Sequence, residues 1–241
     1  MKLDFSALSG EPLQLLMQGL VVTLHLAAWS LLGALAIGLV FGILRWMSLR
    51  AVEPVCWLYV EFARNTPPVV QLLFWYFSAS FILPDGLFRQ IRDIGYEFTA
   101  AAVALAIYHG AFVAEVVRAG LNAIPKGQVE AARALGLGFL QSLRAVILPQ
   151  AARITAPPLV NETVSLIKNT SLAMAIGVTE MTYQYKHIDI FFFRGVEALA
   201  VVTVIYLVLC LATAALGKLL ERSLSRHVHA RRDVRPALTS E

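Results

Sequence analysis

The sequence has little charge and few cysteines. Asp, Glu, Lys and Arg make up 15% of its 241 residues, whereas 58% are hydrophobic. Soluble domains carry about 25% charged residues, so this composition argues against a soluble protein. Both cysteines, Cys56 and Cys210, lie in or beside apolar stretches, where an unpaired cysteine serves as a small apolar side chain. They do not indicate a redox compartment.

Motifs of catalysis are also missing. A phosphate-binding loop reads Gly-x-x-x-x-Gly-Lys-Ser/Thr, and at the nearest approach, Gly217-Lys218, Ala212 replaces the first glycine and Leu219 the hydroxyl residue. The sequence holds no paired carboxylates, Cys/His metal cluster or nucleophile elbow, and the two histidines of the basic tail favour solvation over a metal site. We therefore predict no catalytic residue, no metal, no cofactor in this chain and no enzyme activity.

What the sequence does contain is apolar blocks long enough to cross a bilayer, which takes about 20 helical residues. We predict an all-α membrane protein with five transmembrane helices. A leader occupies residues 1–18, a single transmembrane domain residues 19–222 and a basic tail residues 223–241. The predicted spans are residues 19–44, 66–83, 96–117, 157–181 and 196–217.

A proline pair is expected to break the chain before the second span. Pro67 and Pro68 lack a backbone N–H and disfavour helix just before them, so a short interfacial helix should precede the span. Glu61 and Arg64 lie in that helix three residues apart, a spacing that favours an ion pair. We favour this pairing over direct substrate contact. Glu61, Arg64 and Pro67 are therefore predicted to be structural or gating residues.

The distribution of lysine and arginine predicts the orientation. Of the 20 such residues, 13 lie in connections on one side of the membrane and 5 on the other. The more positive side should be cytoplasmic, which puts the amino terminus outside and the carboxyl terminus inside. Topology thus explains the net charge of +4, and no nucleic-acid partner is predicted. The basic tail is expected to contact lipid headgroups.

The cytoplasmic loop at residues 125–149 is a polar, helix-favouring island between apolar spans. Gly136 and Gly138 divide it into two short helical pieces. Five apolar residues recur at helical spacing and predict one continuous stripe: Leu135, Phe139, Leu143, Val146 and Ile147. Such a stripe needs a groove, either in this protein's own transmembrane domain or in a partner.

The loop also carries a family signature. Glu130-Ala131-Ala132, three further residues, Gly136, nine further residues and Val146-Ile147-Leu148-Pro149 resemble the EAA signature of permease subunits of ATP-binding-cassette (ABC) importers. Only Val146, where isoleucine is usual, departs from it. Similarity to the polar amino acid permeases of that superfamily extends over most of the chain, through the stretches 64–67, 115–120, 124–128 and 161–172.

This resemblance implies the fold of a type I ABC importer permease. The island would be the coupling helix that docks into a cleft of a cytoplasmic ATPase dimer, which binds ATP and Mg in place of this chain. A second permease subunit, identical or related, and a periplasmic solute-binding protein would complete the importer in a bacterial inner membrane. The residues expected to couple to the ATPase are Glu130, Ala131, Ala132, Leu135, Gly136 and Phe139.

The fourth span contains unusual polar residues. A charge near the bilayer centre costs about 2.5–3.5 kcal/mol, so Glu162 and Lys168 should face protein or water. Glu162 and Asn169 are seven residues apart and share a helix face with Ser165, whereas Lys168 points about 120° away. These residues either line a substrate path or hold the bundle together. Lesser candidates for the path are Asn161 and Thr170.

One position in the fourth span bears on the substrate class. Many relatives read Lys-Asp-Thr-Ser where this chain reads Lys168-Asn169-Thr170-Ser171. Loss of that carboxylate beside a retained lysine argues against a cationic substrate and favours acidic or neutral amino acids. Lys168 itself is assigned a structural or gating role.

We therefore expect a permease that imports a polar amino acid by alternating access, driven by its partner ATPases. An ion-coupled secondary transporter is the alternative, although five spans do not divide into two equal inverted halves. A third hypothesis is a receptor or scaffold without transport activity, in which the charges of the fourth span would be purely structural.

Overall fold

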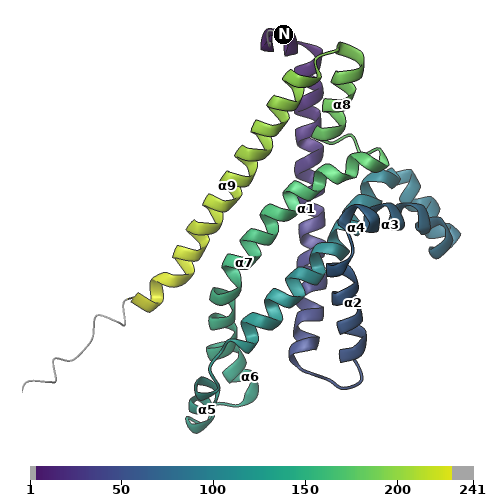
Figure 1. Cartoon of the computed structure of the whole chain (residues 1–241). Helices are drawn as coiled ribbons and strands as arrows, with labels where there is room; N and C mark the ends of the chain where they lie inside the picture. Colours follow the sequence, from purple (N-terminus) through teal and green to yellow (C-terminus); the bar gives the residue numbers. More distant parts are fainter. Residues whose placement is uncertain (1–3, 230–241) are drawn as a thin grey trace, which may run out of the picture.

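The computed structural model describes residues 4–229, and every regular element in that range is helical (Figure 1). The prediction of an all-α protein is confirmed. Three elements are short helices of other types: the 3-10 helices η1 (Phe5–Leu8) and η3 (Thr170–Ile176) and the π-helix η2 (Leu143–Ile147). The α-helices are α1 (Glu11–Trp46), α2 (Glu53–Asn65), α3 (Pro68–Ile82), α4 (Asp85–Asn122), α5 (Lys126–Ala134), α6 (Phe139–Ser142), α7 (Leu148–Asn169), α8 (Met181–Phe192) and α9 (Gly195–His229).

Within the described residues, three helices are long and apolar enough to cross a bilayer: α1, α4 and α9. Helix α1 begins at Glu11, inside the predicted leader, and α4 continues through a kink at Gly95, where φ is 126°. Helix α9 extends beyond the predicted span to His229 and so takes in the first part of the basic tail. Residues 230–241 of that tail lie outside the described part of the chain.

The other two predicted spans correspond to α3 and α7. Helix α3 is apolar but only 15 residues long, and α2 precedes it where an interfacial helix was expected. The break between them falls at Thr66 and Pro67, both extended, as the proline pair predicts. The number of membrane crossings stays a prediction.

Helix α7 differs from the predicted fourth span at both ends. It starts at Leu148, before residue 157, and includes Pro157 and Pro158 in its interior. It ends at Asn169 rather than at residue 181, because the chain tightens into η3 and then turns at Gly177, where φ is 89°. Hydropathy continues through this stretch and gives no sign of the change in backbone geometry.

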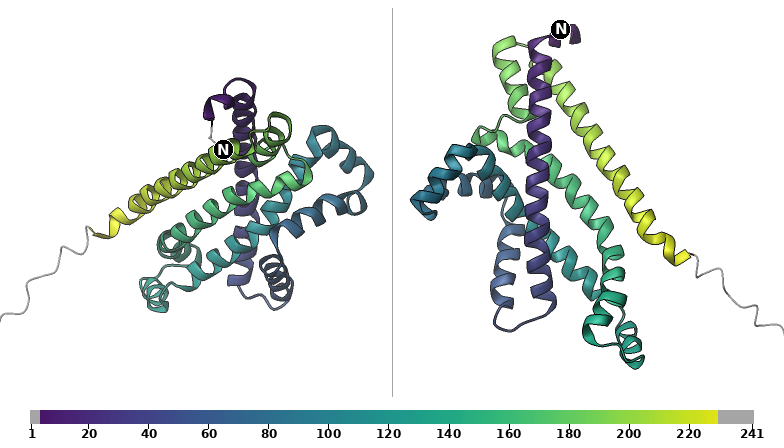
Figure 2. Two further views of the ribbon diagram at one scale, coloured as in Figure 1. Left: turned by 45° about the horizontal axis from the view of Figure 1, so that its top comes forward. Right: turned by 180° about the vertical axis from the view of Figure 1, so that it is seen from behind.

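The core is built around the crossing of α1 and α4 (Figures 1 and 2). Small residues allow the two backbones to approach closely. A Cβ atom added to Gly38 would lie 2.3 Å from Cγ1 of Val113, and one added to Gly42 would lie 2.7 Å from the carbonyl oxygen of Ala114. The glycines spaced four residues apart in α1 are therefore packing residues.

The described amino terminus lies at the opposite end of the molecule from the loop at residues 125–149, which we call the coupling loop after the role that the resemblance implies (Figure 1). At the amino-terminal end, α8 is held against α1 and α9. The backbone N–H of Met181 donates to Oγ1 of Thr23 at 3.2 Å, and the Tyr206 hydroxyl donates to Oε2 of Glu180 at 2.9 Å. Glu180 in turn accepts backbone N–H groups in the first turn of α8. The other end presents α5 and α6.

Candidate functional site: a coupling loop and a buried polar cluster

The coupling loop at residues 125–149 turns sharply at Gly136. The backbone N–H of Gly136 donates to Arg133 O at 2.9 Å and that of Leu137 to Ala132 O at 3.1 Å, the hydrogen-bond pattern of a Schellman cap. Gly136 has a φ of 79°, a region that residues with a Cβ rarely occupy. The glycine of the signature therefore has a backbone role, which is to end α5 and redirect the chain.

The signature residues divide between two faces of α5. Ala132 is buried, whereas Ala131 is exposed and Leu135 is 81% exposed. Glu130 borders a hollow of about 330 Å³ between α5 and the ends of α1 and α4. Phe139, the first residue of α6, is 63% exposed. An apolar surface thus faces outward on a loop at the end of the molecule.

The predicted continuous stripe is wrong, because the loop's apolar residues point in two directions. Ile147 is only 4% exposed and packs with Val113, Val117 and neighbouring apolar residues, and Leu143 packs against the same cluster. The glycines separate Leu135 from Phe139, and the π-helical η2 changes the residue spacing beyond them. The inner half of the set anchors the loop and the outer half remains uncovered.

A polar cluster joins α4 to α7 inside the bundle. Nδ1 of His109 contacts Oε1 of Glu162, and Nε2 of His109 lies 3.2 Å from Nδ2 of Asn169. The His109 side chain is fully buried, whereas the Glu162 side chain is 17% exposed and Asn169 is partly exposed. Glu162 and Asn169, which the sequence places on one helix face, are thus brought together by a residue of another helix.

Sequence reasoning missed His109. The signal was available, because an ionisable side chain in the middle of an apolar span is costly unless it has a partner. The identity of that partner was not available, since 53 residues separate His109 from Glu162. Of the cluster, only the α7 half was predicted.

The remaining candidates of the fourth span do not join this cluster. Thr170 is buried in η3, donates to Ile167 O at 2.7 Å and lies 3.4 Å from the Tyr206 hydroxyl. Ser165 is half-buried on α7. Asn161 and Lys168 are exposed on α7, and Lys168 forms no ion pair within the described chain. Thr170 is therefore structural in its contacts, whereas Asn161 and Lys168 form an uncovered polar face.

The predicted Glu61–Arg64 ion pair is wrong. Oε2 of Glu61 instead accepts a hydrogen bond from Nδ2 of Asn65 at 2.9 Å. The Arg64 guanidinium lies over the Phe112 ring, 5.6 Å from its centroid, because α2 packs against α4 at this level. Pro67 is exposed between α2 and α3.

Glu115 forms an ion pair with Arg118, which lies three residues further on, and this pair is part of a larger group of charges. Nε of Arg118 donates to Oε2 of Glu115 at 3.1 Å, and Nη1 of Arg45 donates to the same oxygen at 2.8 Å. Arg45 also lies 3.6 Å from Oε1 of Glu53. These charges tie the ends of α1, α2 and α4 together near the coupling loop.

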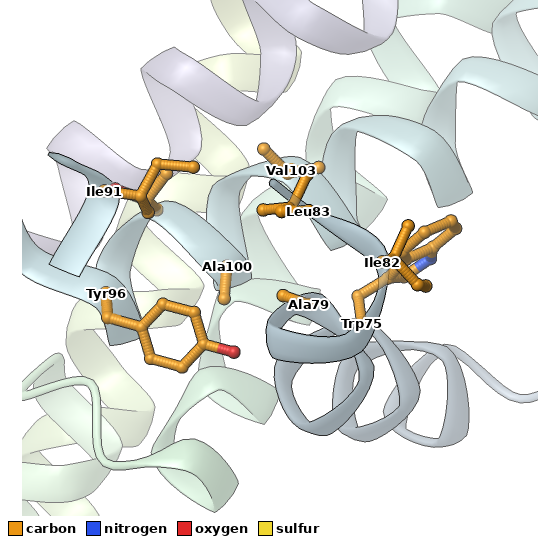
Figure 3. A pocket seen from close by; sticks show the side chains of 9 residues that line it. Trp75, Ala79, Ile82, Leu83, Ile91, Tyr96, Ala100 and Val103 are labelled. Carbon is orange, nitrogen blue, oxygen red and sulfur yellow. The ribbon is translucent and has the colours of Figure 1, made fainter. Parts of the chain in front are cut away.

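A further pocket differs from the polar cluster in its lining. It lies between α3 and α4 beside the kink, and Figure 3 shows mainly apolar side chains around it, with Tyr96 on one side and Trp75 on the other. The Tyr96 hydroxyl donates a hydrogen bond to the carbonyl oxygen of Tyr76. Polar ligands need convergent polar groups, so this pocket does not suit an amino acid.

The family described as "Binding-protein-dependent transport system inner membrane component" matches residues 34–226, a range that contains the coupling loop and the polar cluster. The chain belongs to this family. It is 38% identical over 223 residues to the glutamine transport system permease protein GlnP of Escherichia coli (strain K12), covering 92% of this chain and 98% of that protein. It is 35% identical over 224 residues to the arginine transport system permease protein ArtQ of Bacillus subtilis (strain 168), covering 93% and 98%.

The fold is also found among solved structures. A crystal structure of an amino acid ABC transporter with histidines contains a chain that matches with a TM-score of 0.78 and 32% identity, over 92% of this chain and 100% of that one. The protein is therefore an inner-membrane permease of the amino acid ABC importers, with the type I importer fold. The resemblance inferred from the EAA signature is confirmed at the level of the family.

Proposed function

We propose that this permease passes a polar amino acid across the inner membrane by alternating access, powered by ATP that a partner ATPase dimer hydrolyses. A solute-binding protein would deliver the amino acid at the amino-terminal side, which would face the periplasm. ATP and Mg would bind to the partner, and this chain would hold no cofactor. The single observation that carries the proposal is the uncovered apolar surface of the coupling loop.

The loop has the properties of a docking element. Leu135, Phe139 and Leu140 are 81%, 63% and 59% exposed at the end of the molecule, and neither α5 nor α6 is long enough to cross a bilayer. The inner residues Leu143 and Ile147 pack against Val113 and Val117 of α4 and so fix the loop to the membrane domain. A movement of a partner bound to the outer surface would therefore be transmitted to α4 and α7.

The polar cluster supports a path through the bundle. Glu162, Asn169 and Ser165 would line it, with Glu162 available to the ammonium group of an amino acid. Asn161 and Lys168 are seven residues apart on one face of α7, and both are exposed in the single chain. A polar face is unfavourable against lipid, so a second permease subunit or a water-filled cavity would cover it.

The proposal is tested by reconstituting the permease with its ATPase and binding protein in proteoliposomes. Radiolabelled L-glutamine, L-glutamate and L-arginine are the probes, and ATP is enclosed in the vesicles. We expect uptake of at least one of them that requires both ATP and the binding protein. Uptake by the permease alone under a proton or sodium gradient would contradict the proposal and favour a secondary transporter.

A further inference from the structure

His109 contacts two of the three α7 residues that would line the proposed path, Glu162 and Asn169. Its ring lies in the bundle interior without exposed surface and meets the Tyr108 ring edge-on, with the centroids 5.0 Å apart. Glu162 and Asn169 approach the two opposite nitrogens of the ring. Because buried His109 contacts both partly exposed residues, it fixes the orientation of their side chains.

The hydrogen-bond pattern assigns the proton of this histidine. The Nδ2 group of Asn169 can only donate, so Nε2 of His109 must accept. In a neutral imidazole the proton is then on Nδ1, which donates to Oε1 of Glu162. Neither contact uses Oε2 of Glu162 or Oδ1 of Asn169. Two acceptor atoms on the less buried residues are therefore left for a ligand.

The charge of the cluster narrows the class of that ligand. With neutral His109, the cluster carries one negative charge, on Glu162. Arg64 lies over the Phe112 ring, whose centroid is 6.5 Å from that of the His109 ring, and Lys168 is exposed on another face of α7. One carboxylate matches the ammonium group that every amino acid carries. The cluster has no second negative charge, which a cationic side chain of the ligand would need. An acidic side chain of the ligand would be repelled by Glu162.

Building on the proposed function, we propose that His109 is a specificity-determining positioning residue. It orients Glu162 and Asn169 for an amino acid whose side chain is uncharged and donates hydrogen bonds, such as a carboxamide. The amide at position 169 is part of the same arrangement, because the lone pair of the neutral imidazole requires a donor there.

The test measures binding to the purified permease–ATPase complex without the binding protein, so that the selectivity of the binding protein does not contribute. The ligands are L-glutamine, L-glutamate and L-arginine. We expect glutamine to bind at least about tenfold more tightly than the other two. An equal or greater affinity for arginine or glutamate in the wild-type complex would overturn the inference.

Two substitutions separate positioning from packing. His109→Met fills a similar volume without either hydrogen bond, and the glutamine preference should fall to within about threefold of unity. His109→Gln supplies one donor and one acceptor and should keep most of the preference. A His109→Met complex that assembles and retains the full preference would show that the ring only packs.

Asn169→Asp keeps the inference testable if His109→Met does not assemble. This substitution removes the hydrogen-bond donor to Nε2 of His109 and should lower the affinity for glutamine relative to that for arginine by about tenfold. An unchanged ratio would contradict the proposed role of His109. Absence of ATP-dependent uptake in proteoliposomes would instead overturn the proposed function itself, whereas uptake with an unaltered preference in these variants would overturn only the role of His109.

Discussion

The coupling loop and the polar cluster are built in opposite ways. The loop is a continuous segment, and its proposed working surface is apolar and exposed, with Leu135 and Phe139 uncovered. The cluster is assembled from two helices, and its proposed working groups are polar and mostly buried. A partner protein can be recognised by a large uncovered apolar surface, whereas a small charged ligand requires few groups with fixed orientation. The difference indicates that docking and selection can be altered separately.

The largest effect is expected from removing the charge of the cluster. Glu162→Gln keeps the shape but loses the negative charge, so amino acid affinity and uptake should fall about ten- to a hundredfold, while the ATPase stays bound. Uptake and co-purification of the ATPase are measured on the same preparation. Thr163→Ala is the control, since the Thr163 hydroxyl bonds only to Leu159 O of its own helix. Loss of the bound ATPase in Glu162→Gln would contradict the claim that ATPase docking and amino acid selection can be altered separately.

The converse effect is expected at the turn of the loop. Gly136→Val places a β-branched residue at a φ of 79°, which costs about 1–3 kcal/mol of strain and displaces the chain between α5 and α6. ATPase affinity should fall about tenfold, with amino acid binding unchanged. Gly127→Ala is the matched control, because that glycine of α5 has open space around it. Equal losses in both variants would argue against a role for the Gly136 turn.

A smaller effect on both regions is expected from the helix crossing between them. Gly38→Ala puts a Cβ atom against Val113 and should destabilise the protein by about 1–3 kcal/mol, seen as a lower Tm in detergent. Adding Val113→Ala should restore much of the loss. Gly86→Ala, with no atom within 4 Å of the added Cβ, serves as the control. A Gly38→Ala protein as stable as wild type would be evidence against close packing there.

The smallest effect is expected at Glu61. Because it pairs with Asn65 and not with Arg64, Glu61→Gln should change the free energy of unfolding by less than about 0.5 kcal/mol. Glu115→Gln, which removes charge from a carboxylate bound by two arginines, should cost more. Thermal unfolding of the two variants side by side provides the measurement, and a larger loss at Glu61 would contradict this ranking.

The features that the sequence predicted well are those that depend on residues within one continuous segment. Apolar blocks predicted a helical membrane protein, Pro67 predicted the break after α2, and Gly136 and Gly138 predicted that the loop at residues 125–149 divides into two short helices. These signals are local, so no knowledge of the tertiary structure was needed. Composition and spacing could also identify Glu162 and Asn169 as unusual.

Features that depend on packing could not be predicted. His109 meets Asn169 across 60 residues of sequence, and Arg64 turns to Phe112 because α4 lies beside α2. The single apolar stripe failed because a π-helical turn changes the residue spacing after Ser142. The end of α7 depends on the 3-10 geometry of η3, which leaves hydropathy unchanged.

The central claim, that the outer surface of the coupling loop receives the ATPase, is tested most directly by site-specific cross-linking. Cys56 and Cys210 are first replaced by alanine, and a single cysteine is then introduced at Leu135, Phe139 or Ala132. With a short bifunctional reagent in the assembled importer, we predict cross-links to the ATPase from positions 135 and 139 and none from the buried position 132. Cross-linking from position 132 alone, or from none of the three, would contradict the account.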